Sequence, residues 1–220
     1  MKFLTKQWKR VGLYLLVVGV LVYVYPRSYA VGYIKGKFIN YQNKISAKEG
    51  DFVFQNLSGL LTEIIAAVTE SPYSHCGIVV KKNDKFYVLE AIGPVKETPL
   101  NEWVARGYAQ KITLIRFKEK YQSQIKPIVV EAYKYKGLPY DSRYEWDDEK
   151  IYCSELIYKA VLGATGLKIA NFVELKDLNW QPYEKYIRYL DGGGLPLERK
   201  MVMPVSIVES ESFDVVYSNF

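Results

Sequence analysis

The sequence predicts an α+β fold in which an antiparallel β-sheet packs against helices. Two short apolar segments, residues 74–80 and 86–91, flank the turn residues Asn83 and Asp84, a pattern typical of a β-hairpin. Other segments carry apolar residues at helical spacing. Because strands and helices are mixed without a regular strand–helix–strand rhythm, the antiparallel α+β class is favoured over a parallel sheet.

The elements before and within the hairpin follow directly from these patterns. Residues 51–55 form a short apolar run that predicts a strand. Apolar residues then recur at helical spacing between Leu57 and Val68, and Ser71-Pro72 ends that helix. The hairpin comes next, so the first strand and the hairpin are expected to share one sheet.

The elements after the hairpin are a strand and two helices. Residues 112–117 predict the strand, and residues 125–132 predict a helix that stops near Gly137-Leu138-Pro139. A polar loop, residues 141–150, then leads to a third helical face made of Cys153, Leu156, Ile157 and Ala160. The remaining tail alternates short apolar runs with glycine and proline and yields only a loose prediction.

A charged leader accounts for the basic balance of the chain. The formal net charge is +6, but residues 1–30 carry five basic residues and no acidic one, and the rest holds 25 basic against 24 acidic residues. The remaining chain, residues 31–220, is expected to be one near-neutral domain. A basic surface for nucleic acid is therefore not expected.

The leader also predicts export to the periplasm or cell envelope. Its apolar run, residues 11–25, has no charge and is shorter than the ~20 residues of a membrane span, as in a secretory signal peptide. Ser28-Tyr29-Ala30 offers small residues at a cleavage position. Two alternatives remain: a signal cleaved near Ala30, which leaves a soluble protein, or an uncleaved N-terminal anchor that contacts the membrane.

The counts of histidine and cysteine restrict the chemistry. The chain has one histidine, His75, and two cysteines, Cys76 and Cys153. One histidine excludes sites that need two imidazoles, and two cysteines are too few for a disulfide scaffold or a zinc module. No metal and no cofactor is expected, whereas a thiol nucleophile with a histidine base remains possible.

Cys153 is the candidate nucleophile because it lies where a loop becomes a helix. Unpaired backbone N–H groups and the helix dipole at that position favour the thiolate. The N–H of Cys153 itself would lie near an oxyanion formed on attack. By itself, a cysteine at the start of a helix is more often a core residue, so the prediction depends on its partners.

The hairpin register places a carboxylate beside the histidine. If Asn83-Asp84 is a two-residue loop, Gly77 faces Glu90, and His75 lies diagonally next to Glu90 on the same face. Gly77 has no side chain to block the contact, so Glu90 can accept the ring N–H and fix the tautomer. Cys76 points to the opposite face and is expected to be a small core residue, away from the catalytic face and from a disulfide with Cys153.

Three motifs in this order resemble the permuted papain-like cysteine amidases, the YiiX type within the larger class of NlpC-like cell-wall peptidases. They are the segment Ser71 to Val79 with Ser74-His75-Cys76-Gly77-Ile78, then Val88-Leu89-Glu90-Ala91, then Tyr152-Cys153-Ser154-Glu155-Leu156. Gly50 to Gln55 and Pro139-Tyr140-Asp141 are also similar, and the likeness covers about residues 50–165. The histidine precedes the cysteine here, as circular permutation of the papain-like order implies.

The resemblance implies a circularly permuted papain-like fold and a catalytic triad. Cys153 would be the nucleophile, His75 the general base and later acid, and Glu90 the residue that orients the histidine. Gln55 and Tyr140 would line the cleft or assist the oxyanion. The expected substrate is a peptide or other acyl amide, derived from cell wall or lipid. A lipid-directed acyltransferase or thioesterase, and a non-catalytic envelope-binding module, are the alternatives.

Overall fold

The structure is a computed structural model that describes residues 41–220. The leader and its cleavage position therefore lie outside the described residues. Within residues 41–220, the helices are all too short or too polar to span a membrane.

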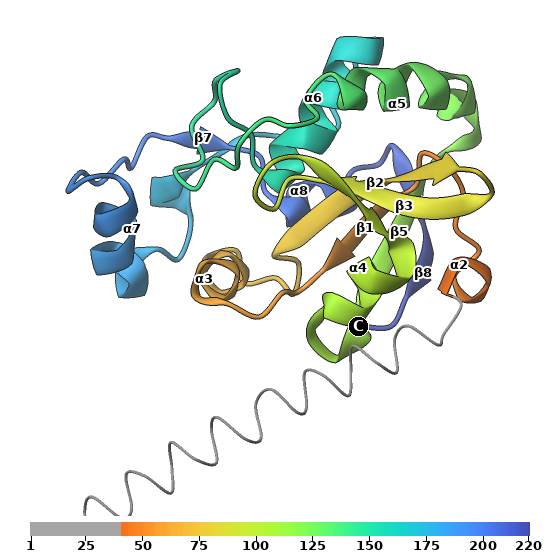
Figure 1. The fold of residues 1–220 in the computed structure, drawn as a ribbon. Helices are drawn as coiled ribbons and strands as arrows, with labels where there is room; N and C mark the ends of the chain where they lie inside the picture. Colours follow the sequence, from red (N-terminus) through yellow and green to blue (C-terminus); the bar gives the residue numbers. More distant parts are fainter. Residues whose placement is uncertain (1–40) are drawn as a thin grey trace, which may run out of the picture.

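A six-stranded antiparallel sheet forms the centre of the molecule (Figure 1). Its strands lie side by side in the order β4-β3-β2-β1-β5-β8, and each pairs with its neighbours in antiparallel register. The strands are β1 (Phe52–Gln55), β2 (His75–Lys82), β3 (Lys85–Glu90), β4 (Lys96–Pro99), β5 (Ile112–Phe117) and β8 (Phe213–Ser218). Strand β1 is buried on both faces along its whole length, and β2 and β3 are buried on both faces except toward their shared hairpin turn.

Helices cover the two faces of this sheet and divide the core in two. Helices α5 (Ile125–Tyr133), α6 (Cys153–Thr165) and α8 (Pro204–Val208) pack on the face that carries Phe52 and Ile78. Helices α2 (Tyr41–Lys44) and α4 (Leu100–Arg106) cover the opposite face (Figure 1). Because side chains alternate along a strand, consecutive residues of β2 contact different helices.

A third, smaller core lies beside the sheet. Helix α3 (Leu60–Val68) packs there against the C-terminal segment, which contains α7 (Glu184–Leu190) and the two-stranded sheet of β6 (Val173–Glu174) and β7 (Lys200–Met201). The shared buried side chains include Ile65, Tyr144 and Tyr152. Short 3-10 helices occupy Tyr108–Gln110, Glu119–Gln124, Leu175–Asp177 and Gln181–Tyr183.

The predicted α+β class is confirmed, with its antiparallel sheet packed against helices. Every predicted strand and helix is present within a few residues of its expected bounds. The structure adds β4 and α4, which the sequence reasoning missed, and resolves the tail into short elements. The positions of β4 and α4 matter, because both contact the candidate site.

Candidate active site

Cys153 is the first residue of α6, as predicted. Tyr152 before it is extended, with φ −99° and ψ 170°, so the helix begins at the cysteine itself. The backbone N–H groups in the first turn of a helix have no partner within the helix. The carboxylate of Glu155 accepts the N–H of Tyr152 at 3.2 Å, which helps to fix where the helix starts. The thiol of Cys153 is almost fully buried.

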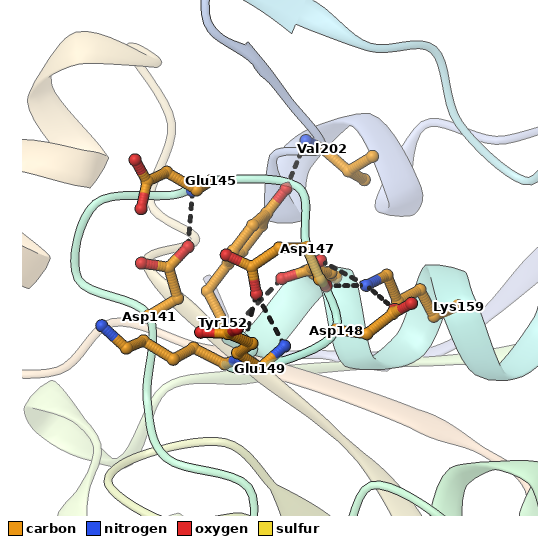
Figure 2. A network of polar contacts seen from close by, with 10 residues as sticks. Asp141, Glu145, Asp147, Asp148, Glu149, Tyr152, Lys159 and Val202 are labelled. Carbon is orange, nitrogen blue, oxygen red and sulfur yellow. Dashed lines mark hydrogen bonds and ion pairs between the residues drawn. The ribbon is translucent and has the colours of Figure 1, made fainter.

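A polar network holds the loop of residues 141–150 against α6 (Figure 2). The ammonium of Lys159, two turns along α6, binds the carboxylate of Asp148 at 2.8 Å and the carbonyl of Asp147. On the other side of the helix start, the hydroxyl of Tyr152 accepts the N–H of Val202 at 3.0 Å (Figure 2). These contacts tie the cysteine-bearing end of α6 to the loop and to the C-terminal segment.

The hairpin brings His75 and Glu90 together in the predicted register. Val79 pairs with Val88, and Lys82 pairs with Lys85. The Nε2 atom of His75 lies 2.5 Å from an oxygen of Glu90. Gly77 makes this possible: a Cβ at that position would lie 2.4 Å from Cγ1 of Val88. The contact engages Nε2, so Nδ1 is the ring nitrogen left for Cys153.

Four side chains donate to the carboxylate of Glu90. Thr98 of β4 donates to one oxygen at 2.6 Å. The other oxygen accepts the indole N–H of Trp103 at 2.9 Å and the guanidinium of Arg106 at 2.5 Å, in addition to His75. Sequence reasoning missed these three residues because it did not predict β4 or α4. The apolar residues Leu100, Trp103 and Val104 are spaced as on one helix face and could have indicated α4.

These contacts shift the pKa values of Glu90 and His75 in opposite directions. Burial alone would raise the pKa of Glu90, but His75 and Arg106 lower it to about 2. Burial alone would lower the pKa of His75, but its hydrogen bonds to Cys153 and Glu90 raise it to about 9. At neutral pH the pair is therefore a carboxylate and an imidazolium.

The thiol of Cys153 lies between His75 and Cys76. Its pKa is lowered well below the usual value, first by a hydrogen bond from the Cys76 thiol and then, against the effect of burial, by His75. The expectation that Cys76 is remote from the catalytic face is wrong. Cys76 does face away from Glu90 and does belong to the core, but α6 covers that side of the sheet and brings Cys153 against it. Both cysteines are free thiols.

The two residues expected to line the cleft, Tyr140 and Gln55, lie in different surroundings. Tyr140 is half-buried, its hydroxyl lies 3.1 Å from that of Tyr144, and its pKa is raised well above normal by burial and then by the nearby Cys153. Tyr140 is thus beside the thiol. Gln55 pairs with His75 across β1 and β2, is fully buried, and has its amide oxygen against Gly107. In this structure Gln55 does not line an open surface.

An apolar cavity of about 80 Å³ lies between α3 and α7. Tyr144, which contacts Tyr140, forms part of its wall. Most of the other lining residues are aliphatic, among them Ile64, Ile65, Leu178, Ile187, Leu190 and Met203. The contact between Tyr144 and Tyr140 therefore links the wall of this cavity to a residue beside the thiol of Cys153.

The chain is similar to proteins of Escherichia coli. It is 33% identical over 170 residues to an uncharacterized protein of strain K12, YiiX, covering 76% of this chain and 84% of the relative. It also matches a crystal structure of YiiX from strain O157:H7, with 32% identity and a TM-score of 0.74, over 79% of this chain and 98% of that one.

The O157:H7 structure is described as that of a metalloprotein. In residues 41–220 of the present chain, no three His, Cys, Asp or Glu side chains are grouped so that they could hold a metal ion. The described residues thus do not supply such a donor set.

The family model for the permuted papain-like amidase enzymes YaeF and YiiX, the C92 family, matches residues 46–217. This span contains both cysteines, the histidine and the carboxylate that the structure brings together. Membership of a circularly permuted family explains why the histidine on a strand precedes the cysteine at the helix start in this sequence. The chain belongs to the permuted papain-like amidases of the YaeF/YiiX family, and it is an enzyme of the cysteine hydrolase kind.

Proposed function

We propose that this protein is an exported cysteine hydrolase that cleaves an amide bond in a cell-envelope peptide. Cys153 is the nucleophile, His75 the base and acid, and Glu90 the residue that orients the histidine. The observation that carries the proposal is the 2.5 Å contact of His75 Nε2 with Glu90, which directs Nδ1 to a thiol at the start of α6. Family membership supports the hydrolase class, and the leader supports export.

The first half of the reaction forms an acyl-enzyme. The thiolate of Cys153 attacks the amide carbon, and the carbonyl electrons move onto the oxygen. The unpaired N–H of Cys153 and the hydroxyl of Tyr140 are the donors proposed for this oxyanion. His75 then gives its Nδ1 proton to the amide nitrogen, the C–N bond breaks, and an acyl-thioester and a free amine result.

The second half releases the acid. His75, now neutral, takes a proton from water, whose oxygen attacks the thioester carbon. The C–S bond breaks, the carboxylic acid leaves, and the Cys153 thiolate and the His75 imidazolium are restored. Glu90 holds the Nε2–H of the ring in both halves, so Nδ1 always faces the thiol and the substrate.

Trapping of the acyl-enzyme tests the nucleophile. The full chain would be mixed with muropeptides from cell wall and with acyl p-nitroanilides, and the intact mass and the released amine would be measured. We expect an acyl adduct on Cys153 and its loss in Cys153→Ala. The matched control, Cys76→Ser, keeps the nucleophile and continues to form the adduct. Unchanged hydrolysis of a responsive substrate by Cys153→Ala would overturn the proposal.

Export has its own test. Cell fractions would be separated, and the N-terminus of the protein would be sequenced from the membrane and soluble fractions. A mature N-terminus near residue 31 supports a cleaved signal, whereas an intact Met1 in the membrane fraction supports an anchor. Recovery of the intact chain from the cytoplasm alone would contradict export.

The apolar cavity favours a second candidate, a lipid-directed acyltransferase or thioesterase on the same residues. A long acyl chain needs an apolar groove near the reacting sulfur, and the cavity wall reaches Tyr144. Hydrolysis of p-nitrophenyl esters of increasing chain length distinguishes the candidates. A preference for long chains that Ile187→Lys abolishes would support the lipid substrate; equal rates would favour peptides. Membership of a family of enzymes argues against a non-catalytic binding module.

A further inference from the structure

Arg106 places a permanent positive charge on the carboxylate that orients the histidine. Its Nη2 atom lies 2.5 Å from the oxygen of Glu90 that also contacts His75 Nε2 at 2.5 Å. Glu90 is fully buried, whereas 21% of the Arg106 side chain is exposed. One carboxylate oxygen therefore lies between two cations, of which only the imidazolium gives up its proton in the reaction.

This difference matters when His75 is neutral. In the acyl-enzyme, the ring has given its proton to the leaving amine, so the only charged partner that Glu90 retains among the described residues is Arg106. A guanidinium keeps its proton at any relevant pH. Without it, a buried carboxylate with neutral donors would favour its protonated form. A protonated Glu90 would be a weaker acceptor for the Nε2–H of the ring, and its own O–H could donate to Nε2 and so favour the other tautomer.

The charged and titratable groups around this centre come from three elements and one loop. Strand β2 provides His75 and Cys76, α4 provides Arg106, α6 provides Cys153, and the loop before α6 provides Tyr140, which lies beside Cys153. The other contacts of Glu90, Thr98 of β4 and Trp103 of α4, are neutral donors. Arg106 is thus the one group within hydrogen-bonding distance of Glu90, in the described part of the chain, whose charge is fixed.

We propose that Arg106 is a positioning residue of the hydrolytic reaction, which keeps Glu90 ionised through the whole cycle and so holds His75 in the tautomer that faces Cys153. This inference rests on the proposed function. The competing explanation is purely structural, namely that Arg106 only anchors α4 to the sheet. The two explanations differ in what they predict for the ionisation of His75.

A second buried arginine–carboxylate pair provides the matched control. Arg116 binds Asp51 through Nε at 2.7 Å and Nη2 at 2.9 Å, and Asp51 is as buried as Glu90. Asp51 precedes β1 at the end remote from Gln55, the residue of β1 that pairs with His75. Loss of this pair should destabilise the protein without affecting the ionisation of His75.

The experiment uses the single histidine as its own reporter. In the full chain labelled with 15N-histidine, long-range 1H–15N spectra contain only the ring of His75 and give its tautomer and its ionisation midpoint. The variants are Arg106→Gln, Arg106→Lys and Arg116→Gln. The pH profile of kcat/KM is measured in parallel on a substrate that acylates Cys153.

Removal of a positive charge makes protonation of every neighbouring group easier. In Arg106→Gln we therefore expect the His75 midpoint to rise by about one pH unit, and both limbs of the activity profile to move to higher pH. Arg106→Lys keeps the charge and should retain the wild-type midpoint and the Nε2–H tautomer. Arg116→Gln should lower the thermal midpoint of unfolding and leave the ionisation of His75 unchanged.

Two results would overturn the inference. One is an Arg106→Gln protein that loses activity while the His75 midpoint stays at the wild-type value, which is the structural outcome. The other applies if Arg106→Gln does not fold: Arg106→Lys with a changed tautomer would show that the charge alone is not what positions the ring. Failure of the proposed function is seen separately, as hydrolysis that survives in Cys153→Ala.

Discussion

Two carboxylates in this molecule are equally buried and differ in their ionisation. Glu90, on the face of the sheet that α4 covers, and Glu155, in α6, both have fully buried side chains. The pKa of Glu90 is lowered to about 2 in spite of burial, by His75 and Arg106. Burial raises the pKa of Glu155 to about 7, although Lys159 lies 3.0 Å away.

The difference lies in the donors around each group. Glu90 accepts hydrogen bonds from four side chains, two of them cationic. Glu155 accepts one backbone N–H, and its one close cation also binds Asp148. Burial disfavours the charged form in both cases, so the number and charge of the donors decide the outcome. The protein thus has one carboxylate that stays charged beside the proposed base and one that titrates near neutrality.

Exchange of each carboxylate for an amide should produce the largest contrast. Glu90→Gln removes the negative charge that stabilises the imidazolium, and we expect kcat/KM to fall by about 10²–10⁴-fold. Glu155→Gln keeps an acceptor for the N–H of Tyr152 and should change kcat/KM by less than about threefold, because a protonated Glu155 is already common at neutral pH. Thermal melts of both variants check folding. Similar losses in the two variants would contradict the conclusion that the donor set gives the two equally buried carboxylates different roles.

The same reasoning applies to the thiolate. Cys76→Ala removes the hydrogen bond that contributes most to the low pKa of Cys153, so we expect that pKa to rise by about one unit or more. The measurement is the pH dependence of iodoacetamide labelling at Cys153, followed by peptide mass spectrometry. Cys76→Ser retains a donor and should keep the midpoint closer to the wild type. A Cys76→Ala midpoint equal to that of the wild type would assign the low pKa to His75 and the helix start instead.

The parts of the site that the sequence predicted are those fixed by short-range geometry. Turn chemistry at Asn83-Asp84 determines the hairpin register, and the register alone places Glu90 next to His75. Likewise, the change from polar loop to helical spacing locates Cys153 at a helix start. Period-2 and helical patterns are local, so they survive without knowledge of the tertiary structure.

The parts of the site that the sequence did not predict depend on which helix covers which face of the sheet. The alternation along β2 correctly separates Cys76 from His75, yet it cannot say that α6 packs on the Cys76 side. The short α4 carries Trp103 and Arg106 to Glu90, but seven residues give a weak periodic signal. Gln55 was expected at the cleft, and its burial against Gly107 follows from the same α4 packing.

Stability should reveal Glu155 as the pH-sensitive carboxylate. Its folded-state pKa lies above the ordinary value of 4.5, so its contribution is complete below pH 4.5 and is lost as the pH rises to about 7. Relative to Glu155→Gln, the wild type should lose about 2 kcal/mol of unfolding free energy between pH 5 and pH 7. Urea denaturation at several pH values measures this difference. His75 is present in both proteins, so the loss of its contribution above pH 6.5 cancels. Parallel curves for the two proteins would contradict the raised pKa.

The smallest effect is expected at the neutral donor of Glu90. Thr98→Val removes the hydroxyl that donates to one oxygen at 2.6 Å and keeps the shape of the side chain. We expect a loss of about 1 kcal/mol in unfolding free energy and less than about fivefold in kcat/KM. Urea denaturation and the activity assay measure the two losses, with Thr98→Ser as the control that retains the hydroxyl.

The small effect expected for Thr98→Val follows from the difference between neutral and cationic donors around Glu90. Arg106 and His75 both remain on the other oxygen in Thr98→Val, so the carboxylate stays ionised and the His75 midpoint should not move. A neutral donor then fixes the orientation of Glu90, whereas the cations fix its charge. A His75 midpoint that moved in Thr98→Val as far as in Arg106→Gln would contradict this division, because removal of a hydroxyl changes no formal charge.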